Sequence, residues 1–369
     1  MANRRVGISR RELMIAVLLY TLGDAVLVIP GIMAAETGRD AWIAGIASIG
    51  VGLLLVSFYC SIAGRHPDKT LVQYSEAVLG RWMGKAISLL YLWFMFILCS
   101  ILLREVGDFL TTLVLPETPI QAIMMLFLGV AVWGARLGIN TIARAAEVFL
   151  PWIVLMFFVG VVFLLPEAKF EKAMPILENG VLPLLPGIYV FSAIPFVELS
   201  VFLMVLPAVE SPDRTRLPFA IGALTGGLAL LLVITLCILV LGAEETARQQ
   251  YPTYSVSRQI TFGDWLQRME IVLAGTWFIT IFFKLTIALY SLCTGFSQWL
   301  GGKSGAPLAM PVGILVLVVS LAVAPNIVTF NESAIRNWPA FAMTCGIMIP
   351  ALLWAADWIK CSMTEDADE

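Results

Sequence analysis

Three ionisable side chains stand deep inside long apolar runs of this sequence. They are Asp24, Glu198 and Lys284, each about 20 Å into its run if the run is helical. A lone charge at that depth of a bilayer costs at least ~2.5 kcal/mol, so each needs a partner, a cavity or a change of protonation state. The chemistry open to them is ion pairing, or the coupling of a proton or a cation to a bound solute.

The elements that must position these side chains are membrane helices. Hydrophobic residues make up 60% of the chain and charged residues 13%, against about 25% charged in soluble domains. A hydrocarbon core of about 30 Å takes about 20 helical residues, and ten apolar stretches have a suitable length. We expect an all-α, multi-pass membrane protein in which 1–369 form one domain. Its spans are predicted at 11–33, 41–64, 86–112, 119–136, 145–165, 183–207, 217–242, 270–299, 307–325 and 338–360.

The distribution of positive charge predicts the orientation of the chain. About twice as many Lys and Arg fall in connections on the side of the N-terminus as on the other side. Cytoplasmic connections carry this excess, so we expect both termini in the cytoplasm. Asp24 interrupts the first apolar run, which we expect to remain part of the fold rather than to be cleaved as a secretory signal.

The orientation also predicts which charges meet. The sixth and eighth runs both enter from the outer side, which places Glu198 and Lys284 at a similar level in the cytoplasmic third, whereas Asp24 rises above the midplane. We therefore expect a Glu198–Lys284 ion pair. Three readings stay open: a purely structural pair, a proton- or cation-substituting role for Lys284, and a lysine that snorkels along lipid.

Two of the predicted spans are interrupted at corresponding positions of the two five-helix halves. Gly23-Asp24-Ala25 precedes Pro30-Gly31 in the first span, and Pro186-Gly187 and Pro195 interrupt the sixth. Such breaks are typical of inverted-repeat transporters, whose half-helix ends face a solute near the midplane. Simple kinks are the alternative reading. The predicted wall of the site is Gly23, Asp24, Ala25, Phe191, Ser192 and Ala193, small enough for a zwitterion such as an amino acid.

Other classes of function find no support in the sequence. It has no G-x-x-x-x-G-K-[ST] loop, no H-E-x-x-H motif and no His/Cys/Asp metal spacing, so we expect no enzyme, cofactor or metal. The formal net charge of -3 lacks the basic excess of a nucleic-acid binder. The six cysteines contain no C-x-x-C pair and are read as reduced.

Two further features belong to the outer side of the predicted bundle. Arg104 and Asp108 are four residues apart and so share a helix face, which predicts a local ion pair. The connection 243–269 is a mixed amphipathic segment, which is read either as a lid over an outer vestibule or as an ordinary connector.

Taken over nearly its whole length, the chain resembles the spore-germination B-subunit (GerAB-type, spore permease) family, a branch of the amino acid-polyamine-organocation transporter superfamily. The resemblance rests on Ile8-Ser9, Gly23-Asp24, Pro195-Phe196-Val197-Glu198, Phe202-Leu203-Met204, Pro207, Pro252, Arg258-Gln259-Ile260, Gly263-Asp264, Arg268-Met269-Glu270 and Lys284. It implies a LeuT-like 5+5 inverted repeat with broken helices 1 and 6. It also implies a place in the endospore inner membrane beside A-type and C-type receptor subunits.

One position departs from the pattern of the family and its transporter relatives. A second small residue, as in G-x-G, is common in the first-helix break, whereas this chain has Gly23-Asp24-Ala25. The acidic side chain could repel a carboxylate or attract an amine, so the class of solute stays open.

These observations support three hypotheses. The first is a receptor subunit that binds a nutrient germinant, such as an amino acid, and shifts the equilibrium of a complex. The second is an amino acid transporter coupled to protons or Na⁺ through Asp24, Glu198 or Lys284. A third is an ion or water conduit opened by a partner subunit.

Overall fold

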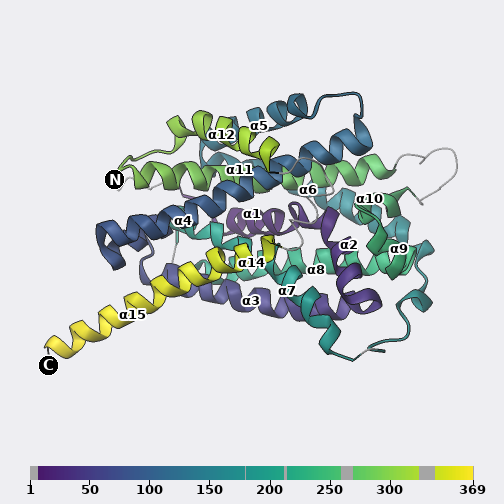
Figure 1. Ribbon diagram of the computed structural model, residues 1–369, viewed down its shortest axis with the longest axis horizontal. Coiled ribbons are helices and arrows are strands. Elements are labelled where there is room, and N and C mark those ends of the chain that lie inside the picture. Colours follow the sequence, from purple (N-terminus) through teal and green to yellow (C-terminus); the bar gives the residue numbers. More distant parts are fainter. Residues whose placement is uncertain (1–6, 179, 212–213, 259–268, 324–336, 369) are drawn as a thin grey trace.

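The computed structural model describes residues 7–178, 180–211, 214–258, 269–323 and 337–368, which form a bundle of helices (Figure 1). The first half holds α1 (Arg10–Leu22), α2 (Ala25–Thr37), α3 (Ala41–Arg65), α4 (Leu71–Phe109), α5 (Ile120–Leu137) and α6 (Ile139–Leu164). The second half holds α7 (Leu185–Ala193), η6 (Val197–Met204), α8 (Arg216–Leu241), α9 (Ala243–Arg248), α10 (Pro252–Ser257), α11 (Met269–Trp299), α12 (Ala309–Ala322), α14 (Trp338–Met343) and α15 (Ile349–Asp368).

Shorter turns link or extend these helices. The 3-10 turns are η1 (Gly38–Asp40), η3 (Leu165–Glu167), η4 (Phe170–Ala173), η5 (Leu182–Leu184), η7 (Leu206–Ala208) and η10 (Ala306–Leu308). Two π-helical turns, η2 (Leu110–Val114) and η11 (Thr344–Met348), extend α4 and join α14 to α15.

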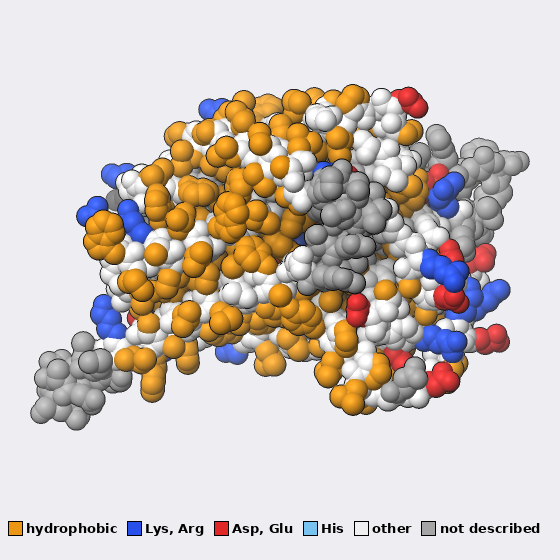
Figure 2. All heavy atoms as spheres, in the orientation of Figure 1, with side chains coloured by type: hydrophobic (Ala, Val, Ile, Leu, Met, Phe, Trp, Pro, Cys, Tyr) orange, Lys and Arg blue, Asp and Glu red, His pale blue; other side chains and the backbone are white. Residues whose placement is uncertain are grey.

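The bundle has the dimensions and surface of a membrane protein. Within the described residues, 8 helical segments are long and apolar enough to cross a bilayer, one of them running from α2 through α3, and Ala306–Ala322 is a shorter apolar helix. The first predicted span is divided between α1 and α2. It does not form a segment of its own, because α1 has 13 residues and α2 is counted together with α3. Figure 2 shows apolar side chains over the middle of the visible face, with charged side chains gathered at its two ends.

The first predicted break is real and begins at a glycine. Ser9 and Glu12 start α1 with a capping box, since the Glu12 amide donates to Ser9 Oγ (3.2 Å) and the Ser9 amide donates to a Glu12 carboxylate oxygen (2.7 Å). The helix ends at Leu22, and Gly23 turns the chain with φ 13° and ψ -114° before α2 begins at Ala25. Thr280 Oγ1 of α11 donates to the Gly23 carbonyl (3.2 Å), which satisfies one of the groups freed by the break.

The sixth segment is also interrupted, at Pro195 as predicted, whereas Pro186-Gly187 lie in the first turn of α7 and Pro30-Gly31 lie inside α2. The α-helix α7 ends at Ala193, two residues before Pro195, and the chain resumes as the 3-10 helix η6. Proline lacks an amide hydrogen, so Pro195 cannot donate the next helical hydrogen bond, which favours the end of the regular helix here. All eight residues of η6 are buried.

The two interrupted segments are tied together at one end. The Ile8 amide donates to the Ala208 carbonyl (3.0 Å) and the Glu210 amide donates to the Ile8 carbonyl (3.0 Å). This isolated bridge links the start of α1 to the end of the sixth segment. It gives the Ile8-Ser9 motif a structural role.

One helix begins earlier than the sequence predicted. The third span was expected to start at residue 86, whereas α4 begins at Leu71, after the capping residue Thr70. Gly80 has φ 79° and ψ 175° and bends this long helix, a backbone shape that side chains other than glycine rarely adopt. Residues 71–79 therefore form a separate helical segment before the bend at Gly80.

Candidate functional site

The buried lysine of α11 lies between carboxylates from both interrupted segments. Lys284 Nζ is 2.5 Å from Asp24 Oδ1 and 2.5 Å from Glu198 Oε2. Lys284 and Glu198 are fully buried and Asp24 is 7% exposed. One ammonium therefore connects the start of α2 to η6 through two buried ion pairs.

The Glu198–Lys284 contact agrees with the pair expected from the sequence, but the expected separation of Asp24 from it is wrong. Counting residues along an unbroken helix placed Asp24 at a different level. Because α1 stops at Leu22 and the chain turns at Gly23, the Asp24 carboxylate reaches Lys284 instead. The reading of Lys284 as a lysine that snorkels along lipid is likewise wrong, since its side chain is fully buried.

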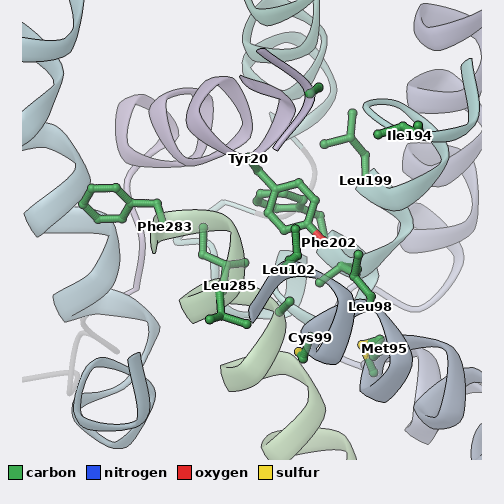
Figure 3. Close-up of a cluster of buried hydrophobic side chains, with 14 of the residues drawn as sticks. Tyr20, Met95, Leu98, Cys99, Leu102, Ile194, Leu199, Phe202, Phe283 and Leu285 are labelled. Atoms are coloured by element: carbon green, nitrogen blue, oxygen red, sulfur yellow. The ribbon is translucent and has the colours of Figure 1, made fainter. Parts of the chain in front are cut away.

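An apolar shell encloses this three-residue cluster. The Lys284 ammonium lies 5.2 Å from the centre of the Tyr20 ring, which meets Phe202 edge-on at 5.3 Å. Figure 3 shows Tyr20 among apolar side chains that include Leu98, Leu102, Leu199 and Phe202. Ion pairs are little screened in such surroundings, so the loss of one partner leaves an uncompensated charge.

Glu198 has a second partner that sequence reasoning missed. Trp338 Nε1 donates to Glu198 Oε1 (2.7 Å), and the indole stacks on Phe94 with ring centres 5.6 Å apart. The sequence carries no local signal for this contact, because the two residues are 140 positions apart.

A cavity of about 280 Å³ adjoins the cluster. Asp24 lines it from the first break and Glu198 from the sixth segment, together with Glu105 of α4. The remaining wall is Val28, Gly31, Ile32, Ala35, Leu98, Ile101, Ile194, Ala247, Arg248, Gln249, Gln250, Tyr251 and Trp338. The volume is close to the lower end of ordinary ligand pockets, which begin at about 300 Å³, and fits a small solute.

Of the six predicted wall residues, Asp24 alone is among the residues that line this cavity. Asp24 lines it, while Gly23 and Ala25 lie beside Asp24 in the break. Phe191, Ser192 and Ala193 are buried at the end of α7, immediately before the lining residue Ile194.

Glu105 is a second feature that sequence reasoning did not identify as part of the site. Its neighbours Arg104 and Asp108 form the predicted local pair, with Arg104 Nε 2.9 Å from Asp108 Oδ2. Glu105 itself is 5% exposed and lines the cavity, and its Oε1 has no hydrogen-bond partner among the described residues. A helical-face pattern cannot reveal that Glu105, between the paired Arg104 and Asp108, lies in the cavity wall.

A larger hollow of about 740 Å³ lies next to the inner cavity. Ala35, Ala247 and Arg248 line both spaces. Arg248 Nη2 is 2.6 Å from Glu244 Oε1, and both belong to α9. In the described part of the amphipathic connection, α9 lines both spaces through Ala247 and Arg248, while residues 259–268, with most of its family motifs, lie outside the described residues.

No metal site accompanies these carboxylates. Among the residues that the structure describes, no group of three or more His, Cys, Asp or Glu is arranged to hold a metal ion.

Comparison with known families agrees with this architecture. The profile of the family described as "Spore germination protein" matches residues 7–328. This chain belongs to the spore germination protein family. Among its curated relatives, spore germination protein KB of Bacillus subtilis (strain 168) is 30% identical over 325 residues, which covers 87% of this chain and 86% of that protein. Spore germination protein YndE of the same organism is 24% identical over 328 residues, or 86% and 87% of the two chains.

Solved structures place this spore germination protein in a LeuT-like transporter fold. MhsT in complex with L-phenylalanine superposes with a TM-score of 0.69 at 15% identity, covering 93% of this chain and 88% of that one. Mhp1, a nucleobase-cation-symport-1 family transporter with bromovinylhydantoin bound, gives 0.65 at 16% identity over 94% and 78% of the two chains. The expected fold class, an all-helical membrane bundle with breaks in the first and sixth segments, is confirmed.

Proposed function

We propose that this spore germination protein is the solute-binding membrane subunit of a nutrient germinant receptor. The observation that supports this best is the 280 Å³ cavity at the two helix breaks, lined by Asp24 and Glu198. Both residues pair with Lys284, so a solute that contacts either carboxylate acts on α2, η6 and α11 together. Binding that favours one arrangement of these three elements would shift the equilibrium of a receptor complex.

The proposed ligand is an amino acid or a similar small solute. Its amino group would meet the carboxylates of the cavity, and a carboxylate would meet backbone amides freed where α2 begins. Gly23, Asp24, Ala25, Phe191, Ser192 and Ala193 remain the proposed wall of the break, now joined by the lining residues Glu105 and Glu198.

The proposed setting is the inner membrane of the endospore, with A-type and C-type receptor subunits as partners. Both termini are proposed to be cytoplasmic. In Figure 2 the left end of the molecule carries mainly Lys and Arg and the right end carries charges of both signs. In Figure 1 the end of α15 lies at the left, so the positive-inside rule supports a cytoplasmic location for this end.

A coupled amino acid transporter is the second candidate. The observation in its favour is the position of Lys284 between two carboxylates beside the first break. At this position a cation could take the place of the ammonium, or a proton could be exchanged. The folds of MhsT and Mhp1 are compatible with such an activity.

Binding by the purified full-length chain in lipid nanodiscs tests the first proposal. Thermal unfolding is followed with each of the twenty standard L-amino acids in turn, and with D-glucose as a solute without an amine. We expect at least one amino acid to raise the unfolding temperature, and Asp24→Asn to abolish the shift. A shift with glucose alone, or with an amino acid but undiminished in Asp24→Asn, would contradict a site at the breaks.

Uptake into liposomes separates the two candidates. The same chain is reconstituted alone, and uptake of the labelled amino acid that stabilises it is measured with and without an imposed pH or Na⁺ gradient. A receptor subunit binds without concentrating the solute. Concentrative uptake by this chain alone would establish the transporter.

A further inference from the structure

Among the described residues, the cavity is lined by more carboxyl groups than there are cations in contact with them. Three carboxyl groups line it, those of Asp24, Glu105 and Glu198. One ammonium, that of Lys284, contacts two of them. Glu105 forms no ion pair within the described part of the chain, although it is 5% exposed. A carboxyl group in this position either holds a proton or is ionised beside a positive partner.

The neighbouring charges do not supply that partner. Among the described residues, the cavity brings Asp24, Glu198 and Arg248 to Glu105, and the first two of these are acidic. The buried cation of the site, Lys284, already contacts both Asp24 and Glu198. Arg104 pairs with Asp108, and Arg248 at the mouth pairs with Glu244.

Within the described chain, Glu105 combines an unpartnered carboxylate oxygen with a place in the cavity wall. Its Oε1 is buried and has no hydrogen-bond partner among the described residues. A buried acceptor without a donor is unusual in a protein interior. Here it belongs to a carboxylate that lines a space of about 280 Å³, so a donor bound in that space can pair with Glu105.

The rest of the wall defines the shape of that donor. Aliphatic side chains, which favour a methylene chain, make up much of it: Val28, Ile32, Leu98, Ile101 and Ile194. The amides of Gln249 and Gln250 line the cavity from the side of α9 and can accept or donate a neutral hydrogen bond.

We propose that the cavity selects a small aliphatic amine with a net positive charge, and that Glu105 binds its ammonium group. This inference rests on the proposed function of the cavity as a solute site and names the class of solute. A zwitterionic amino acid brings one charge of each sign and leaves the surplus on the protein unchanged. A diamine or a basic amino acid brings the missing positive charge, in a charge-assisted hydrogen bond.

L-lysine and L-norleucine are the matched probes, since they share a six-carbon skeleton and differ in the ammonium at its end. Their dissociation constants are measured by titration calorimetry on the full-length chain in nanodiscs. We expect L-lysine to bind at least about tenfold more tightly than L-norleucine. Equal or tighter binding of L-norleucine would overturn the inference while leaving an amino acid site in place. Binding of neither probe, nor of any other amino acid, would remove the proposed function itself.

Variants then assign the preference to Glu105. Glu105→Gln removes the charge and should bring the two dissociation constants close together. Glu117→Gln is the matched control, because Glu117 is an exposed acid in the connection between α4 and α5, and it should leave the preference unchanged. If Glu105→Gln does not fold, Glu105→Asp keeps the negative charge on a side chain that is one methylene shorter. It should raise the dissociation constant of L-lysine at least about threefold and leave that of L-norleucine unchanged. An unchanged preference in Glu105→Gln, or an unchanged L-lysine affinity in Glu105→Asp, would assign the selectivity elsewhere.

Discussion

Lys284 of α11 contacts Asp24 at the first helix break, although the two residues are 260 positions apart in the chain. The contact is possible because Gly23 has no side chain. A Cβ built at Gly23 would lie 2.3 Å from Lys284 Cδ and 3.0 Å from the Tyr20 carbonyl oxygen. The break in α1 thus has two functions: it brings the Asp24 carboxylate to the ammonium and leaves space for the lysine chain that carries it.

Removing the shared ammonium should be the most damaging single change in the cluster. Lys284→Met leaves Asp24 and Glu198 buried without their cation, which costs about 3 to 5 kcal/mol. Glu198→Gln leaves Lys284 paired with Asp24 and should cost less. The double variant should lose at least about 1 kcal/mol less than the sum of the two, because without the lysine the Glu198 charge is itself destabilising. Unfolding in detergent measures all three, and strict additivity would show that the two side chains act independently.

The space at Gly23 gives a second prediction. Gly23→Ala should displace the Lys284 side chain, destabilise the protein by about 1 to 3 kcal/mol and abolish the response to ligand. Gly50→Ala in α3 is the control, since a Cβ there meets nothing within 4 Å, and alanine favours a helix by up to about 1 kcal/mol over glycine. Equal stability of the two variants would mean that Gly23 does not hold the lysine in place.

The helical elements and the two breaks could be predicted from the sequence because each depends on local chemistry. Apolar length defines a membrane helix, and Pro195 removes a helical hydrogen-bond donor at the point where α7 ends. The pairing of Glu198 with Lys284 also followed from counting residues, since the order of the spans fixes which ends are level.

The remaining contacts depend on the path of the chain in three dimensions. Gly23 takes φ 13° and ψ -114°, and no count along a helix contains that turn. Glu105 stands between Arg104 and Asp108, and only the packing of α4 against the cavity separates its environment from theirs. Trp338 contacts Glu198 because of the orientation of α14 about its own axis, which an apolar stretch of sequence does not specify.

The indole of Trp338 provides a test of how Glu198 is held. Trp338→Phe removes the donor to Glu198 Oε1 but retains an aromatic ring against Phe94. A hydrogen bond to a charged acceptor contributes about 1.5 to 3 kcal/mol, so we expect a loss of that size in unfolding free energy and weaker ligand binding. Trp82→Phe is the control, because Trp82 is 87% exposed. A loss no larger than that of Trp82→Phe would show that the hydrogen bond contributes nothing to stability.

The contact between α1 and α8 gives the last prediction. Gly222 and Gly226 form a G-x-x-x-G pattern, and a Cβ at Gly222 would lie 2.5 Å from the Met14 carbonyl oxygen, while one at Gly226 would lie 2.7 Å from Thr21 Cβ. Small residues at such positions let membrane helices approach closely. Gly222→Val should therefore push α8 away from α1 and destabilise the protein by about 1 to 3 kcal/mol. Gly50→Val, at a glycine in the interior of α3 with nothing within 4 Å, carries a similar change in helix propensity without the clash. The difference between their unfolding free energies isolates the packing. Because α1 carries the break at its end, we also expect Gly222→Val, and not Gly50→Val, to weaken ligand binding. Unweakened binding in a destabilised Gly222→Val would separate the packing of α1 from the geometry of the site.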